Sequence, residues 1–274
     1  MKRSTFNIVK NVIIGVIIAV TLFICIFPIY WMFITSIISW HVVLTYPPKL
    51  IPTEITLEYW DMAFKKFLLP LQNSLIIASI TTFLALLLGT PAGYSFARFR
   101  VGGPHIAFWI LSLRFLPGIV PLVALYLLFS NLGLLDTHLA VIAAHLIITV
   151  PFAVWMMKSF IENIPIELEE AALLDGCSRL GVLRRVIVPL SAPGMVITAL
   201  FSFIWSWNEF MFALILTKSK SYTLPVMIAG FRGAGVIWGG VSASALLAII
   251  PSLILAIFLQ RYLIAGLTFG TVKG

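Results

Sequence analysis

The chain has 274 residues, of which 61% are hydrophobic and only 10% are charged. Soluble domains carry about 25% charged residues, so this composition excludes a soluble globular protein and favours a membrane protein. The net charge is +8, but the basic residues lie mainly between apolar runs, which indicates membrane topology rather than nucleic-acid binding.

The first element is an apolar run at residues 12–37, preceded by a basic N-terminal stretch. A cleaved signal peptide has a shorter apolar core, followed by a small-residue cleavage site. We therefore expect a retained first transmembrane helix that also directs insertion. Residues 40–66 have mixed charge and several prolines, and they are expected to form an ordered extracytoplasmic loop that completes an N-terminal part, residues 1–66.

Five further segments are apolar enough to cross a bilayer, for which a helix needs about 20 residues. Helix is the expected form because lipid offers no partner to unpaired backbone groups. The predicted fold class is thus all-α, a polytopic membrane protein with six transmembrane helices. Residues 67–265 form its transmembrane domain, and residues 266–274 form a cytoplasmic tail. The five segments are residues 67–97, 105–129, 139–157, 192–216 and 241–264.

The lysines and arginines are unevenly divided between the two sides of these spans, and the richer side is normally cytoplasmic. Placing the N-terminus inside puts most of the 18 basic residues inside, which predicts that both termini are cytoplasmic. The inner set is Lys2, Arg3, Lys10, Arg98, Arg100, Lys158, Arg179, Arg184, Arg185, Arg261 and Lys273, and the outer set is Lys49, Lys65, Lys66, Lys218, Lys220 and Arg232.

Residues 158–190 form the longest predicted cytoplasmic segment, and their local signals describe two short helices. Pro165 stands where a first-turn proline belongs, and acidic residues follow it, as is favourable at a helix N-terminus. Gly176 ends this first helix, because glycine readily adopts the left-handed conformation. The acidic residues are Glu167, Glu169 and Glu170.

The second helix of this segment is predicted to begin after Ser178, which can cap it. Leu180, Leu183 and Ile187 share one face, and Pro189 is expected to stop the helix. Such a helix pair could dock into a groove of a partner protein, or it could be an interfacial amphipathic loop with no partner. The residues alone leave both interpretations open.

The sequence Glu-Ala-Ala-Leu-Leu-Asp-Gly at 170–176 resembles the EAA loop of binding-protein-dependent ABC importer permeases. That pattern reads E-A-A, three residues, G, nine residues, I-x-L-P, and this chain matches its spacing with Val186 and Val188 at the Ile and Leu positions. The resemblance implies a coupling helix that docks in a cleft on an ATP-binding subunit. The implied coupling residues are Glu170, Ala171, Ala172, Asp175, Gly176 and Pro189.

Two other segments are similar to carbohydrate-type permeases, namely Trp-Asn-Glu-Phe at 207–210 and the tail, which resembles the end of the maltose-type second permease. In that family the tail reaches the ATPase interface, which implies the same for Lys273 and Gly274. The resemblance implies uptake of a sugar, oligosaccharide or polyol across a bacterial or archaeal inner membrane. The implied partners are ATP-binding subunits, a second homologous permease subunit, an extracytoplasmic solute-binding protein, the carbohydrate and membrane lipid, with no nucleic acid and no cofactor.

Polar groups inside a membrane are costly and are therefore functional candidates. Arg114 falls near the middle of the third span, and Asn208 and Glu209 lie in the fifth. An Arg114–Glu209 pair would neutralise both charges, and either structural pairing or contact with solute remains open. Trp207 is a candidate for the translocation path. Aromatic side chains can stack on a sugar ring, and interfacial anchoring or packing is the alternative; the aromatics considered are Trp31, Trp109, Trp155, Trp205 and Trp207. His145 in the fourth span is expected to be a hydrogen-bonded packing residue, with a proton relay as the alternative.

The alternative function is an ion-coupled secondary transporter, which would predict inverted repeats and carboxylates at the midplane. Only Glu209 approaches that description, and the sequence shows no repeat. The chain has no G-x-x-x-x-G-K-[ST] phosphate loop, so ATP hydrolysis is expected on a separate subunit and this chain is not expected to be an enzyme. Catalytic and metal-binding motifs such as H-E-x-x-H and G-x-S-x-G are missing from the sequence as well.

Overall fold

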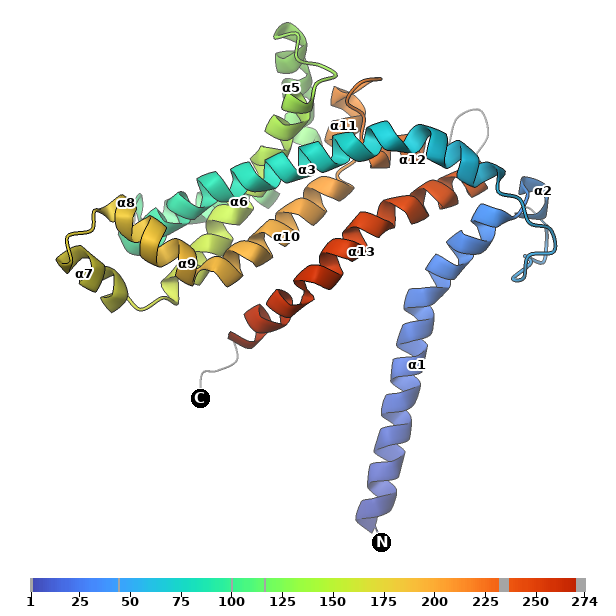
Figure 1. Ribbon diagram of the computed structural model, residues 1–274, viewed down its shortest axis with the longest axis horizontal. Coiled ribbons are helices and arrows are strands. Elements are labelled where there is room, and N and C mark those ends of the chain that lie inside the picture. Colours follow the sequence, from blue (N-terminus) through green and yellow to red (C-terminus); the bar gives the residue numbers. More distant parts are fainter. Residues whose placement is uncertain (1, 44, 100, 116, 232–236, 270–274) are drawn as a thin grey trace. The chain divides into compact units, whose positions relative to one another are not determined.

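The computed structural model describes residues 2–43, 45–99, 101–115, 117–231 and 237–269. Every regular element in these ranges is a helix (Figure 1), which confirms the predicted all-α class. Lys273 and Gly274, the predicted tail contacts, lie outside the described residues.

Within the described ranges, four helices are long and apolar enough to cross a membrane as single elements. Two more spans are obtained if each of two bent helix pairs counts as one, so the predicted number of six is reached only in that way. The single-helix spans lie in α1 (Lys2–Ile37), α3 (Glu58–Phe99), α6 (His138–Glu162) and α13 (Trp238–Phe269).

One bent pair lies in the segment that the sequence predicted as the third span, and the other joins Arg179–Leu190 to Ala192–Asn208 at a bend of 77°. Neither the third nor the fifth predicted span is one continuous helix. The third divides into α4 (Gly103–Ser112), the 3-10 helix η1 (Leu113–Phe115) and α5 (Ile119–Asn131). The fifth divides into α10 (Ala192–Asn208) and α11 (Met211–Leu216). The division at Glu209 has a local cause, because its carboxylate accepts the backbone N–H groups of Phe212 and Ala213 and so caps α11.

The described residues form two compact units, each with its own packing. The first comprises Met1–Leu68 and Ile228–Ile250 and includes α1, the short α2 (Trp40–Val43) and the first turns of α3. Helix α3 begins at Glu58, so the segment predicted as a loop over residues 40–66 is partly helical. Within this unit the hydroxyls of Thr35 and Ser242 lie 2.8 Å apart, and Trp60 Nε1 donates to Ser36 Oγ.

Most of the apolar surface of α1 is uncovered within this unit. None of the 18-residue hydrophobic window within Val9–Ile37 is buried, whereas Ile34, Ile37 and Ile38 at the end of the helix form a small core. An apolar helix surface of this length is stable only against lipid or another protein. This helix therefore fits the predicted membrane anchor.

The second unit, Leu69–Met227 with Pro251–Gly274, holds three helices that run side by side, namely α6, α10 and the corresponding part of α3 (Figure 1). Two glycines one turn apart bring α3 against α6. A Cβ built on Gly89 would lie 2.5 Å from the Cβ of Ala153, and one on Gly93 would lie 2.8 Å from the backbone nitrogen of Lys158. Small residues four apart allow close helix approach of this kind within membranes.

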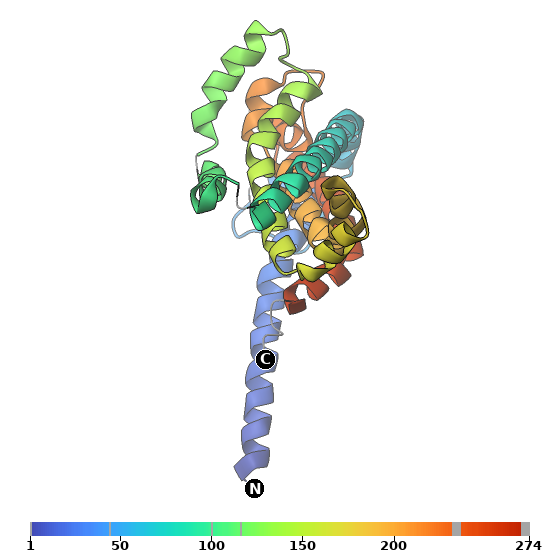
Figure 2. The same cartoon turned by 90° about the vertical axis from the view of Figure 1, so that its left-hand side faces the viewer.

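Besides α4 and η1, which contact α6, further helices of this unit lie at the two ends of α6. At its N-terminal end α5, α11 and α12 (Leu224–Gly230) surround a core that contains Leu122, Phe129 and Phe212. At its C-terminal end a second core forms around Met157 and Ile161. This second core supports α7 (Glu167–Leu174), α8 (Arg179–Val182), the π-helical η2 (Leu183–Ile187) and α9 (Val188–Leu190), which together make up the 158–190 loop (Figure 2).

Candidate functional site

The turn of the 158–190 loop has the geometry that its sequence predicts. Gly176 has a φ of +85° directly after α7, its N–H donates to Leu173 O, and the N–H of Cys177 donates to Ala172 O. These two bonds form a Schellman motif, which satisfies carbonyls at the end of the helix. Ser178 then caps α8 by accepting the N–H of Gly181 at 3.2 Å, which confirms the predicted cap.

The second arm of the loop differs from the prediction. Leu180 is 55% exposed, whereas Val182 and Ile187 are fully buried. Ile187 is buried as predicted and Leu183 packs against the second core, so Leu180 is the one predicted position that leaves this face. The helical hydrogen bonding changes to a π-turn over Leu183–Ile187, which the sequence did not predict. Pro189 does not stop the helix, which continues to Leu190 and then meets α10 at a bend of 77°.

The face of α7 that turns away from the second unit's core carries most of the predicted coupling residues. Glu170, Ala171, Asp175 and Gly176 are exposed, whereas Ala172 is half-buried beside the second core. Leu174 lies at the tip with 89% of its surface exposed. An exposed leucine at the end of a short rigid helix has the form of a knob for a partner's groove.

The opposite face of α7 is fixed to the end of α3 by a buried ion pair. Glu169 accepts a hydrogen bond from Arg98 Nε through one carboxylate oxygen and from the Tyr94 hydroxyl, at 3.0 Å, through the other. Arg98 also donates to Ile164 O at 2.7 Å. The sequence analysis placed Glu169 in an acidic first turn and missed this contact, because a pairing of residues about 70 positions apart leaves no local pattern.

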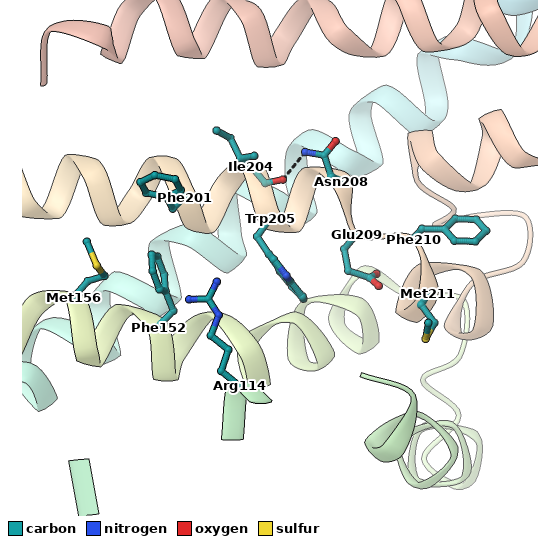
Figure 3. Close-up of a pocket in the computed structure, with 10 residues that line it drawn as sticks. All are labelled: Arg114, Phe152, Met156, Phe201, Ile204, Trp205, Asn208, Glu209, Phe210 and Met211. Carbon is teal, nitrogen blue, oxygen red and sulfur yellow. Dashed lines mark hydrogen bonds between the residues drawn. The ribbon is translucent and has the colours of Figure 1, made fainter. Parts of the chain in front are cut away.

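The second unit also contains a pocket of about 810 Å³ between α6, α10 and η1 (Figure 3). Three of the predicted translocation residues, Arg114, Asn208 and Glu209, line it together. The fourth, Trp207, is 3% exposed, stacks on Phe203 and is not part of this lining. The other lining residues are mostly aromatic or apolar: Phe152, Met156, Phe201, Ile204, Trp205, Phe210 and Met211.

Arg114 and Glu209 have separate partners in this pocket. The Arg114 guanidinium lies over the ring of Phe152 at 4.4 Å and points into the pocket beside Trp205 (Figure 3). Glu209 pairs instead with His145 Nε2, at 3.1 Å. Glu209 is therefore paired with His145. The described ion pairs do not include the Arg114–Glu209 pair that the sequence left open.

His145 joins α6 to α10 from a fully buried position. Its Nδ1 lies 2.7 Å from Ser206 Oγ, and its ring meets the Trp205 ring edge-on at 5.4 Å. These contacts agree with the prediction of a hydrogen-bonded packing residue. Glu209 thus helps to shape the wall of the pocket, while the Arg114 guanidinium supplies a polar group to its interior. Asn208 also lines the pocket, with its Nδ2 donating to Ile204 O at 2.8 Å.

At the other end of α6, Asp136 holds two loops together. Its carboxylate accepts backbone N–H groups from Lys218, Ser219, Lys220 and Ser221. Burial acts to raise the pKa of Asp136, but these hydrogen bonds outweigh it and leave the pKa far below its ordinary value. The loop before α6 and the loop after α11 therefore form one ordered surface.

Among the described residues, no group of three or more His, Cys, Asp or Glu side chains is placed to hold a metal ion. The second unit thus combines an aromatic pocket between helices, an exposed short helix at one end of α6 and an ordered loop pair at the other.

Comparison with known proteins matches residues 85–268 to the binding-protein-dependent transport system inner membrane component. The diacetylchitobiose uptake system permease protein DasC of Streptomyces coelicolor is 34% identical over 281 residues, with 100% of each chain covered. The trehalose/maltose transport system permease protein MalG of Thermococcus litoralis is 36% identical over 259 residues, with 92% of each chain covered.

A similar fold occurs in the crystal structure of a bacterial ABC transporter involved in the import of the acidic polysaccharide alginate. The TM-score is 0.75 at 22% sequence identity, and the match covers 93% of this chain and 96% of that chain.

Proposed function

Because the chain belongs to the family of binding-protein-dependent transport system inner membrane components, we infer that it is the permease subunit of an ATP-driven ABC importer for a carbohydrate. The observation that carries this inference is the extent of the family match, which includes the pocket and the whole 158–190 loop. In this function the chain forms half of a membrane channel.

The carbohydrate assignment is supported by the names of its relatives, which describe uptake of diacetylchitobiose and of trehalose or maltose. The pocket is compatible with such a solute. Trp205, Phe201 and Phe210 offer aromatic faces for the apolar side of a sugar ring, and Arg114 and Asn208 offer polar groups for its hydroxyls. We propose these five residues as the contacts of this chain with its solute.

Coupling to ATP hydrolysis is assigned to the exposed face of α7. Leu174 would enter a groove on an ATP-binding subunit, and Glu170 would provide a charged contact at its edge. The Gly176 turn holds the tip through its backbone hydrogen bond to Leu173 O and its positive φ, and a Cβ at Gly176 would meet no other atom of the described chain within 4 Å. Pro189, Lys273 and Gly274 remain predicted contacts of the same partner.

The proposed assembly has the chain in the inner membrane of a bacterium or archaeon with both termini in the cytoplasm. Its partners are a second homologous permease subunit, ATP-binding subunits that carry out hydrolysis, and an extracytoplasmic solute-binding protein. A cysteine introduced at Ser178, with Cys25 and Cys177 replaced by serine, tests the orientation. A membrane-impermeant thiol reagent should label it only after cells are permeabilised, and labelling of intact cells would reverse the topology.

Uptake of radiolabelled diacetylchitobiose, trehalose and maltose by cells that express the full importer tests the function. We expect uptake of at least one of them to stop on ATP depletion and to persist with a proton uncoupler. Glu170→Gln should lower this uptake several-fold, whereas Glu162→Gln, an exposed control at the end of α6, should not. Uptake that an uncoupler stops while ATP is maintained would instead establish the ion-coupled alternative.

A further inference from the structure

We propose that Glu169 is a positioning residue that fastens α7 to α3, so that a displacement of α7 by an ATP-binding subunit moves α3. This proposal rests on the proposed function, because it assumes that an ATPase docks on the exposed face of α7. It adds a second route into the membrane beside the direct chain connections from α7 to α6 and to α10.

The contact geometry distinguishes Glu169 from its acidic neighbours. Glu169 is 5% exposed, whereas Glu167 and Glu170 on the same helix are exposed. Its two carboxylate oxygens are divided between Arg98 and Tyr94, which lie one helical turn apart on α3. The carboxylate is therefore directed at α3, opposite the face that is proposed to meet the ATPase.

Burial strengthens the ion pair between Arg98 and Glu169. The side chains of Arg98 and Glu169 are 10% and 6% exposed, so solvent screens their attraction only weakly. Removing one partner of a buried pair leaves the other charge without compensation, which is strongly unfavourable. A separation of α7 from α3 would break both hydrogen bonds of Glu169 together, and Arg98 Nη2 also donates to Ile164 O in the segment that leads into α7.

The other arm of the loop reaches the same turn of α3. The Arg179 guanidinium lies 4.7 Å from the centre of the Phe99 ring, and Phe99 in turn meets the Tyr94 ring edge-on at 5.5 Å. Both helices that flank the Gly176 turn are thus bound to the last turn and a half of α3. From there α3 runs as one helix past Gly93 and Gly89, its close contacts with α6.

The experiment measures the reactivity of a cysteine placed on α3 in the assembled importer. Phe83, a 64% exposed residue of α3, is replaced by cysteine in a chain whose Cys25 and Cys177 are serine, and the rate of labelling by monobromobimane is measured with and without ATP and vanadate. Wild-type contacts should give a nucleotide-dependent change in this rate. Glu169→Gln should reduce that change at least about tenfold, the loss expected for a hydrogen bond to a charged group.

The amount of ATPase subunit that co-purifies with each variant separates positioning from docking. It should be the same for wild type, Glu169→Gln and the control Glu162→Gln, and the control should retain the full change in labelling. Exchanging the charges, with Arg98→Glu and Glu169→Arg together, should restore part of the signal. If the Glu169→Gln chain does not accumulate in the membrane, Tyr94→Phe decides, with an expected reduction of about tenfold, because the Tyr94 hydroxyl donates to the same charged carboxylate.

Full nucleotide-dependent labelling in Glu169→Gln, or in Tyr94→Phe where it decides, would overturn the proposal. So would the absence of any labelling change in wild type, or a loss of signal in Glu169→Gln that merely follows a loss of bound ATPase. A wild-type chain that brings down no ATPase would contradict the proposed function itself, which keeps the two failures distinct.

Discussion

Asp136 shows how one residue can order a surface that its sequence alone would leave as two loops. It has a φ of +59°, unusual for a residue other than glycine, and its carboxylate is surrounded by the N–H groups of residues 218–221. Asparagine and aspartate tolerate this backbone conformation better than other side chains. The conformation and the hydrogen bonds therefore depend on the same side chain.

Replacing Asp136 by asparagine is expected to destabilise the protein by about 1.5 kcal/mol or more at pH 7, because hydrogen bonds to a charged acceptor are lost. The pKa of Asp136 is lowered in the folded state, so its stabilisation is complete above the unfolded pKa, about 4, and is lost as the pH falls below that value. Thermal unfolding in detergent between pH 3 and pH 7 should show the two proteins converging in acid.

Asp61→Asn is the control for Asp136→Asn, since Asp61 forms an exposed pair with Lys65 that contributes little to stability. Its unfolding temperature should stay close to that of the wild type across this pH range. A difference between Asp136→Asn and wild type that is constant from pH 7 to pH 3 would show that the carboxylate charge is not what holds the loops.

At the scale of elements, the contact between α3 and α6 depends on the absence of side chains at Gly89 and Gly93. A Cβ on Gly93 would lie 2.8 Å from Lys158 N and 3.0 Å from Val154 O, and these backbone atoms cannot rotate out of the way. The two helices would have to move apart, which would reduce packing along their length.

Gly93→Ala is therefore expected to lower the free energy of unfolding by about 1–3 kcal/mol, as overpacking does in other close contacts. Gly15→Ala is a matched control, because Gly15 also lies inside a long apolar helix but a Cβ there meets nothing within 4 Å. The control should be neutral or slightly stabilising. Equal unfolding temperatures for Gly93→Ala and wild type would mean that α3 and α6 are less closely packed than described.

Sequence signals predicted those features that arise within a few residues. The turn at Gly176 and the cap at Ser178 have local signatures, and both were confirmed. The π-turn in the second arm has no such signature and was not predicted. Of the predicted face, Leu183 and Ile187 pack against the core, whereas Leu180 is exposed. Pairs that join distant segments, such as Glu169 with Arg98, were not predictable from one sequence because they depend on how the helices pack.

In the pocket, too, the residues were predictable from the sequence whereas their partners were not. Polar residues inside apolar spans identified Arg114, Asn208 and Glu209, and the structure places all three around one cavity. Their partners were not foreseen, because the choice of His145 rather than Arg114 for Glu209 depends on the break between α10 and α11. Hydropathy indicated where the fifth span lies, but it could not indicate that a side chain would end one helix and cap the next.

At the scale of the whole molecule, the proposed coupling to ATP hydrolysis requires a partner at the tip of α7. Leu174 is almost fully exposed, and Glu170 and Asp175 flank it with charges that have no structural task in the described chain. A single exposed apolar side chain is ordinary on a protein surface, but covering this one with a partner would remove its apolar area from water and so favour docking. Gly176 sets the direction of this tip, so a substitution there is expected to weaken binding of the ATP-binding subunit the most.

The most direct test of the account is co-purification from native membranes of the wild-type chain, Gly176→Asp and Gly133→Asp. Gly133 is a matched control, since it also has a positive φ of +66° and open space around its Cβ position, but it lies in the loop before α6. The account predicts that an ATP-binding subunit accompanies the wild type and Gly133→Asp in equal amounts and is strongly reduced with Gly176→Asp. A wild-type chain that purifies without any ATP-binding subunit, or equal recovery with Gly176→Asp, would contradict it.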